Sequence, residues 1–369
     1  MEVVINPTFK QSTILTAGFI LFGLATIWPP LILVCAFLTS KFLSYTNLNN
    51  DDAPARRLWW SKMKSQGLPP WLAVPSSVTY EESYWVNSRG MCLMSYISTP
   101  TSRPPKAVLM YCHGYGDQAS WLKAAEYRRL VKEGYAVMAL EYEGHGRSDG
   151  TLVGFGSFDR LAGDVKDYME ETYLKNFKGL KLFVGGESMG GAVAYTVASS
   201  SSLVSGAVLI CPMCAIHENL KPPQFVIDLL YKVVGPPGTI NAVGMLPLAP
   251  SKSVNENSFK LTEKRILSES TNSRYTRLPR LCVARELLDA TSKISSSLHT
   301  FSKPFIVLHG DADKVTDPDL SKQLHDSAES KDKTIKLYEG MWHTLTTGEP
   351  EENIDKVFGD IKTWLDERS

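Results

Sequence analysis

Short runs of apolar residues recur along most of the chain and are separated by longer segments in which apolar and polar positions mix. Strands that are buried on both faces of a parallel sheet have this uniformly apolar character. The pattern therefore predicts an α/β fold with a doubly wound, mostly parallel sheet. The runs lie at 107–112, 135–140, 180–184, 206–210, 304–308 and 334–338.

Helical periodicity fills the intervals between these runs. In 158–172 and again in 353–365, apolar residues recur every three or four positions, as on one face of a helix. Residues 84–97 instead alternate around the turn Asn87-Ser88-Arg89-Gly90, a pattern typical of a β-hairpin.

One long interval, 213–298, has no strand-like run and holds several helix candidates separated by prolines. It falls between the fourth and fifth parallel strands, and an insertion there overhangs the sheet edge where ligands bind. We therefore expect a helical lid at 213–298, between a first part of the core at 80–212 and a second part at 299–369.

The amino-terminal residues have a different pattern. No charged residue occurs between Lys10 and Lys41. This uncharged stretch is longer than the roughly 20 residues that a membrane-spanning helix needs. We expect a membrane anchor at 1–50 and a linker at 51–79. A single spanning helix is one form of the anchor, and a hairpin broken at Pro29-Pro30 is another. A cleaved signal peptide is the third interpretation.

Residues 56–64 carry four basic side chains, and the positive-inside rule therefore places the large domain on the cytosolic side. We expect the membrane to be the endoplasmic reticulum or another endomembrane. Trp59, Trp60 and Trp71 lie nearby in the sequence. They suit the membrane interface, or they pack on the globular domain.

The charge balance and the cysteines narrow the class further. The chain has 39 Lys and Arg against 39 Asp and Glu, which argues against nucleic-acid binding. Outside the apolar run, five cysteines remain at irregular spacing, so no disulfide framework is expected. Cys211 and Cys214 form a lone CxxC, a weak zinc signal. We expect no metal and no organic cofactor.

The strongest chemical motif is Gly-Glu-Ser-Met-Gly at 186–190, between a predicted strand and a predicted helix. In that context the glycines allow a tight turn that exposes the Ser188 hydroxyl as a nucleophile. A serine needs a base and an acid, which should follow at the ends of later strands. His343 is the expected base. The acid remains open among Asp311, Asp313 and Asp317.

An acyl-transfer site also needs donors for the developing oxyanion. The backbone N–H groups of Tyr115, in His113-Gly114-Tyr115-Gly116 after the first parallel strand, and of Met189 are the candidates. We interpret His113, His145 and His309 as structural.

The motifs HGYG, GHGRSDG, GESMGGA, HGDADKVTDP, YEGMWH and WLDER together resemble the monoacylglycerol lipase family of α/β-hydrolases, over about residues 80–368. The resemblance is greatest to plant or algal members. It implies an α/β-hydrolase fold and identifies Asp313 as the triad acid. Glu187 stands where animal members usually have His, and the lid, especially 221–257, resembles the family less than the core does.

The expected function is hydrolysis of a monoacyl lipid ester at a membrane, such as monoacylglycerol, through an acyl-enzyme on Ser188. Lysophospholipase or caffeoyl-shikimate-type esterase activity, and acyl transfer on the same triad, are the alternatives. A receptor that only binds its ligand is a further alternative from another class. The oligomeric state is left open.

Overall fold

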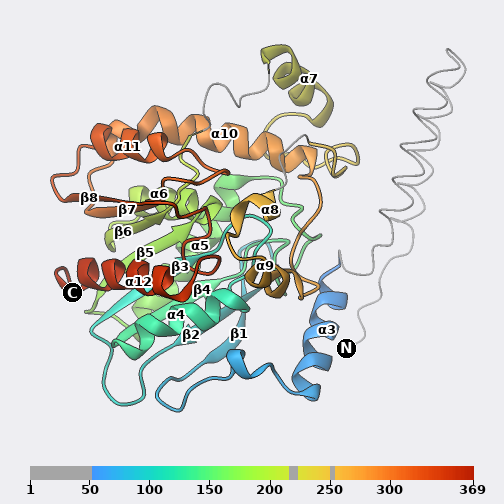
Figure 1. The fold of residues 1–369 in the computed structure, drawn as a ribbon. Helices are drawn as coiled ribbons and strands as arrows, with labels where there is room; N and C mark the ends of the chain where they lie inside the picture. The colour runs from blue at the N-terminus through green and yellow to red at the C-terminus, as the bar shows by residue number, and fades with distance from the viewer. Residues whose placement is uncertain (1–51, 216–222, 250–253) are drawn as a thin grey trace, which may run out of the picture.

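The structure is a computed structural model, and it describes residues 52–215, 223–249 and 254–369. Within these residues, eight strands form one sheet with the spatial order β1-β2-β4-β3-β5-β6-β7-β8 (Figure 1). The strands are β1 (Glu81–Val86), β2 (Cys92–Ser98), β3 (Ala107–Cys112), β4 (Tyr135–Leu140), β5 (Lys181–Glu187), β6 (Val204–Ile210), β7 (Phe305–Gly310) and β8 (Lys333–Tyr338).

Strands β3 to β8 pair in parallel, and β2 pairs antiparallel with both β1 and β4. The prediction of a mostly parallel sheet is thereby confirmed, and so is the hairpin, with its turn between Val86 and Cys92. Every residue of β3, β4 and β7 is buried, which explains why these strands are uniformly apolar in sequence.

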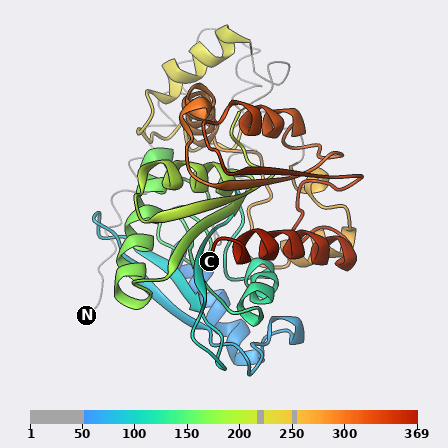
Figure 2. The ribbon, with the colours of Figure 1, turned by 90° about the vertical axis from the view of Figure 1, so that its left-hand side faces the viewer.

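Helices cover both faces of the sheet (Figure 2). One face packs against α4 (Leu122–Lys132) and α12 (Glu351–Asp366), and the other against α5 (Phe158–Asn176) and α6 (Met189–Ser200). The short helix α11 (Pro318–Ser327) connects β7 to β8. Two hydrophobic cores result, one on each side, as expected for a doubly wound sheet.

The segment between β6 and β7 is helical and contains no strand among its described residues. Its helices are α7 (Gln224–Val234), α8 (Val254–Ser258), α9 (Thr262–Glu269), α10 (Leu281–Ser297) and the 3₁₀ turn η4 (Leu298–Thr300). The stretch around α8 and α9 bonds to the loop after β8, where the Thr344 N–H donates to the Ser258 carbonyl at 3.0 Å. Farther along, the Tyr275 N–H donates to the Gly116 carbonyl at 2.9 Å. The insertion therefore borders two loops that follow parallel strands.

The segment 51–79, expected as a linker, contains helix α3 (Ala53–Gln66) and the 3₁₀ turn η2 (Pro70–Leu72). The Arg56 side chain is fully buried, and it donates to the carbonyls of Gly146 at 2.6 Å and Ser148 at 2.7 Å. These bonds satisfy loop carbonyls that would otherwise lack partners, so α3 is docked firmly on the core.

The tryptophans of this segment pack on the globular domain, the second of the two interpretations. The Trp121 ring, just before α4, makes edge-to-face contacts with Trp59, Trp60 and Trp71, at centroid distances of 6.1, 5.5 and 4.9 Å. Among the described residues, no helix combines the length and apolar character that crossing a bilayer requires. The predicted anchor at 1–50 lies outside them.

Candidate active site

Ser188 lies in the tight turn between β5 and α6, with φ 60° and ψ −122°. A non-glycine residue seldom adopts a positive φ, and such strain is typical of functional sites. The turn needs glycine nearby because a Cβ on Gly190 would overlap the carbonyl oxygens of Cys112 and His113. The Ser188 N–H donates to the Ile210 carbonyl at 2.9 Å, and its side chain is partly exposed.

The structure brings Asp313 and His343 together from the loops after β7 and β8. His343 Nδ1 lies 2.7 Å from Asp313 Oδ2, and the carboxylate is fully buried. The same carboxylate accepts the N–H groups of Val315 at 2.7 Å and Thr316 at 3.1 Å, which fix its orientation. A buried carboxylate on Nδ1 holds an imidazole in the tautomer that leaves Nε2 free to accept a proton.

The other two candidate acids have structural contacts instead. Asp311 is exposed and accepts the Gly340 N–H at 2.7 Å. Asp317 caps helix α11 by accepting the Asp319 N–H at 2.9 Å. Only Asp313, of the three, contacts His343, so the geometry agrees with the acid that the family resemblance implied.

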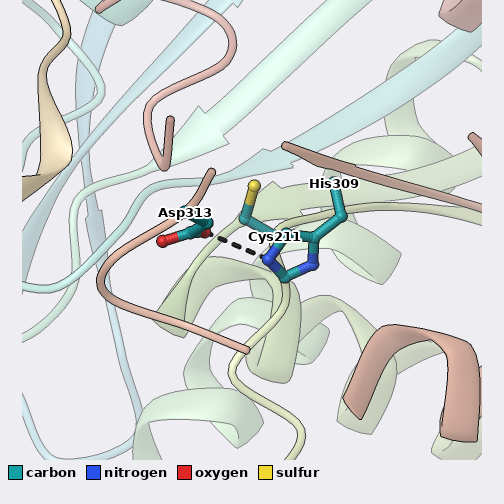
Figure 3. Close-up of side chains that lie close together, drawn as sticks. All are labelled: Cys211, His309 and Asp313. Atoms are coloured by element: carbon teal, nitrogen blue, oxygen red, sulfur yellow. Dashed lines mark hydrogen bonds and ion pairs between the residues drawn. The ribbon is translucent and has the colours of Figure 1, made fainter. Parts of the chain in front are cut away.

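His309 also contacts the Asp313 carboxylate. The sequence indicated only a structural role for His309 and did not predict this contact. Its Nε2 lies 3.0 Å from Asp313 Oδ2 (Figure 3). Its Nδ1 lies 2.7 Å from Ser321 Oγ. Burial by itself would raise the pKa of Asp313, but the charge of His343 and hydrogen bonds from both histidines outweigh it. The pKa therefore lies well below its ordinary value, and the carboxylate stays ionised.

The Cys211 side chain lies beside His309 and Asp313, and one potential ligand atom from each of the three falls within 4.8 Å of the others (Figure 3). Burial and the nearby carboxylate raise the pKa of the Cys211 thiol well above its usual value, so it stays protonated. Zinc prefers a thiolate, and the Asp313 oxygen is already bonded to two histidines. Cys211 and His309 are therefore better suited to orienting the Asp313 carboxylate than to binding a metal ion.

A buried ion pair joins the turn of Ser188 to the loop of His343. Glu187, next to Ser188, pairs with Lys123 of α4, and both side chains are almost completely buried. Lys123 also donates to Thr346 Oγ1 at 2.8 Å, and the Thr346 N–H donates to Glu187 at 3.3 Å. Because Thr346 lies three residues after His343, this network ties the predicted base to the predicted nucleophile.

The two predicted oxyanion donors border the same turn. Met189 is the first residue of α6, where N–H groups have no acceptor within the helix. Tyr115 follows Gly114, where a Cβ would lie in ordinary contact with the Ser188 Cβ, 3.7 Å away. Their roles, like those of Ser188, Asp313 and His343, remain predictions that the geometry allows.

Replacing Asp313 by Asn is expected to lower the rate of ester hydrolysis on the order of 10⁴-fold, because the amide cannot hold the imidazole in the required tautomer or stabilise its charged form. The neighbouring Asp311→Asn variant is the matched control and should stay within a few-fold of wild type. Steady-state kinetics of both proteins checks this. Equal losses in the two variants would reassign the acid.

Stability should fall with acid because His113 is buried and neutral. Burial lowers the pKa of His113 to about 4, whereas an unfolded histidine titrates near 6.5. The folded state therefore binds fewer protons in this window, and roughly 3 kcal/mol of stability is lost as the pH falls from about 6.5 to about 4. The free energy of unfolding, measured by chemical denaturation across this range, should depend less steeply on pH in His113→Gln than in wild type. The exposed His299→Gln control should keep the wild-type slope.

Known proteins resemble this chain over most of its length. The Hydrolase_4 family model, described as serine aminopeptidase, S33, matches residues 103–351. Caffeoylshikimate esterase from Arabidopsis thaliana is 32% identical over 305 residues, covering 78% of this chain and 89% of that protein. Human monoglyceride lipase is 30% identical over 300 residues, covering 80% and 94%.

A solved structure has the same fold. It is a soluble variant of monoglyceride lipase from Saccharomyces cerevisiae in complex with a substrate analog. The TM-score is 0.64 at 21% sequence identity, and the match covers 80% of this chain and 96% of that chain. At this identity the likeness concerns the fold alone.

Proposed function

Since the chain belongs to the Hydrolase_4 family and is a monoacylglycerol lipase-like α/β-hydrolase that acts on carboxylic esters, we propose that it cleaves a monoacyl lipid ester through an acyl-enzyme. The observation that carries the catalytic part is the contact of His343 with a buried, ionised Asp313. The strained turn that presents Ser188 supports it.

In this mechanism Ser188 Oγ attacks the ester carbonyl while His343 Nε2 takes the hydroxyl proton. Asp313 stabilises the resulting imidazolium. The N–H groups of Tyr115 and Met189 stabilise the oxyanion. The imidazolium then protonates the leaving alcohol, and water, activated by the same imidazole, releases the fatty acid and restores the serine.

The lipid part of the proposal is supported by helix α7 in the insertion. Phe225, Leu229 and Val233 are 72%, 57% and 43% exposed, and their spacing of four residues places them on one side of the helix. Exposed apolar faces of this kind mark contact with lipid or with a partner. The apolar residues 11–40 would hold such a face near a membrane.

A caffeoylshikimate-type ester is the second candidate substrate, and the Arabidopsis relative favours it. The triad chemistry would be the same, since only the pocket contacts distinguish an acylglycerol from an aryl ester. Lysophospholipid hydrolysis and transfer of the acyl group to an added alcohol are the remaining outcomes to be tested.

Purified full-length protein is expected to hydrolyse monooleoylglycerol with a kcat/KM at least tenfold above that for caffeoyl shikimate and lysophosphatidylcholine. Chromatographic analysis of the products, with and without added glycerol, distinguishes hydrolysis from transfer. A preference for caffeoyl shikimate would assign the second substrate and contradict the lipid proposal. Turnover of none of the esters would contradict both.

We also propose that residues 1–50 anchor the protein, with the catalytic domain on the cytosolic side. The full chain should stay in the membrane fraction after extraction with alkaline carbonate. Protease added to sealed vesicles should cleave the catalytic domain without detergent. Release by carbonate would contradict the anchor. Protection of the catalytic domain from protease would contradict the orientation.

A further inference from the structure

A cavity away from Ser188, Asp313 and His343 lies where α3 and η2 meet β1 and α4. Its volume is about 230 Å³, and its walls include Trp60, Leu72 and Tyr80. No residue that lines it belongs to the candidate active site. Its functional meaning is therefore a separate question from ester hydrolysis.

The charge of Arg128 at this cavity lacks a counterion. The residue is only 5% exposed, and its Nη1 donates to the carbonyls of Leu72 at 2.9 Å and Ala73 at 3.0 Å. Among the described residues, no carboxylate lies within ion-pair distance of its guanidinium, and burial lowers its pKa. The two carbonyls and the Tyr80 ring, whose centroid lies 5.3 Å from Arg128 Cζ, stabilise this charge without neutralising it, so the site suits an occupant that brings a negative charge.

Two N–H groups at the cavity also lack acceptors. Arg128 Nε and Trp60 Nε1 are both buried, and neither has a hydrogen-bond partner. Buried donors of this kind are usually satisfied, so each calls for an explanation. Because each of these nitrogen atoms has almost no accessible surface, a ligand in the cavity would not contact them, and an anion there would be held by the charge of Arg128.

Glu82, the carboxylate that lines the cavity, already has partners. It accepts from Arg147 at 2.7 and 3.0 Å and pairs with Lys64, and these contacts lower its pKa to about 2 although burial opposes this. The buried Glu141 accepts the Arg147 N–H at 2.7 Å. Lys64 and Arg147 thus occupy Glu82, and neither Glu82 nor Glu141 pairs with Arg128.

Beside the polar residues Lys64, Tyr80 and Ser120, the lining includes four apolar side chains. Trp60 and Leu72 are buried, and Leu68 and Val74 are exposed at the rim. The volume corresponds to roughly eight water molecules, enough for a short chain or a single ring. We propose that this cavity binds a small monocarboxylate with an apolar body, its carboxylate toward Arg128 and its body against Leu72.

Such an acid has two possible sources, an aliphatic acid of the kind that ester hydrolysis releases or an aryl acid. Calorimetric titration of the full-length protein with hexanoate and with benzoate distinguishes the two sources, because the acid of the correct class should bind more tightly. Hexan-1-ol and benzyl alcohol, which match the bodies without the charge, serve as neutral probes. The acids are expected to bind at least tenfold more tightly than the alcohols.

The neighbouring arginine provides a matched control. Arg129 is paired with Glu126 at 2.7 Å and Glu351 at 2.6 Å and does not line the cavity. The variant Arg128→Gln should weaken binding of the acid at least tenfold, and Arg129→Gln should leave it within twofold.

A second variant tests the site if Arg128→Gln fails to fold. Leu68→Glu places a negative charge at the exposed rim and should also weaken binding of the carboxylic acid at least tenfold. The proposal would be overturned if the folded variants bound the acids as tightly as wild type. It would also be overturned if acids and alcohols bound equally, or if neither acid bound. Because heat of binding is measured, these outcomes do not depend on whether the protein hydrolyses lipid esters.

Discussion

Replacing Ser188 by alanine is expected to reduce ester hydrolysis by on the order of 10⁴-fold or more, because no other group can form the acyl-enzyme. Labelling by a fluorophosphonate probe should disappear as well. The fold should persist, since the Ser188 side chain is partly exposed and the turn depends on backbone bonds and on the glycines around it. Rates with the preferred ester, together with circular dichroism, check both parts.

The matched control is Ser157→Ala. Ser157 caps helix α5 by accepting the Arg160 N–H at 3.2 Å, and its loss should cost about 1 kcal/mol of stability with little effect on the rate. If the Ser188→Ala protein retains wild-type turnover, another residue is the nucleophile and the proposed mechanism is wrong.

Breaking the ion pair between Lys123 and Glu187 should give the largest change in stability. In Lys123→Met the Glu187 carboxylate is left buried without its partner, at a cost of about 3–5 kcal/mol in the free energy of unfolding. Activity should also fall, because the same network holds Thr346 and therefore the loop of His343. Urea denaturation followed by fluorescence measures the first effect, and kcat measured well below the denaturation midpoint measures the second.

Two further variants isolate the cause. Lys166→Met breaks an ion pair on the surface, with Glu170 at 3.0 Å, and should cost less than about 1 kcal/mol. The double variant Lys123→Met with Glu187→Leu removes both buried charges and should recover much of the lost stability. A Lys123→Met protein as stable as wild type would show that the pair contributes little.

The elements that were easiest to predict are those whose burial is uniform. Strands β3 and β4 begin and end where the apolar runs do, because both of their faces are covered and every position must be apolar. The amphipathic pattern of α12 was equally clear, since one face packs on the sheet and the other is solvated. The tight turn at Ser188 was predictable because the glycines around it are needed locally.

The docking of α3 was harder to predict. The sequence pattern indicated that Arg56 is one of several basic residues near a membrane. In the structure, Arg56 is fully buried against the loop carbonyls of residues 146 and 148. Lys123 likewise lies on a helix where lysine usually marks the solvated side, and it is buried. Nothing in the local pattern separates a buried, paired cation from an exposed one, because its partner is distant in sequence.

The sequence alone determined the alternation of strands and helices, the position of the insertion and the sharp turn at Ser188, and it predicted the order in which an acid and a base follow that turn. These features depend on local periodicity and on backbone conformations that neighbouring residues dictate. The residue pattern left the acid open among Asp311, Asp313 and Asp317, the family resemblance implied Asp313, and the tertiary structure shows that Asp313 contacts His343. Only the tertiary structure decided that His309 shares this carboxylate and that Lys123 and Glu187 join two loops. Those contacts form between loops brought to one edge of the sheet by strand order, and sequence spacing does not encode which side chains meet there.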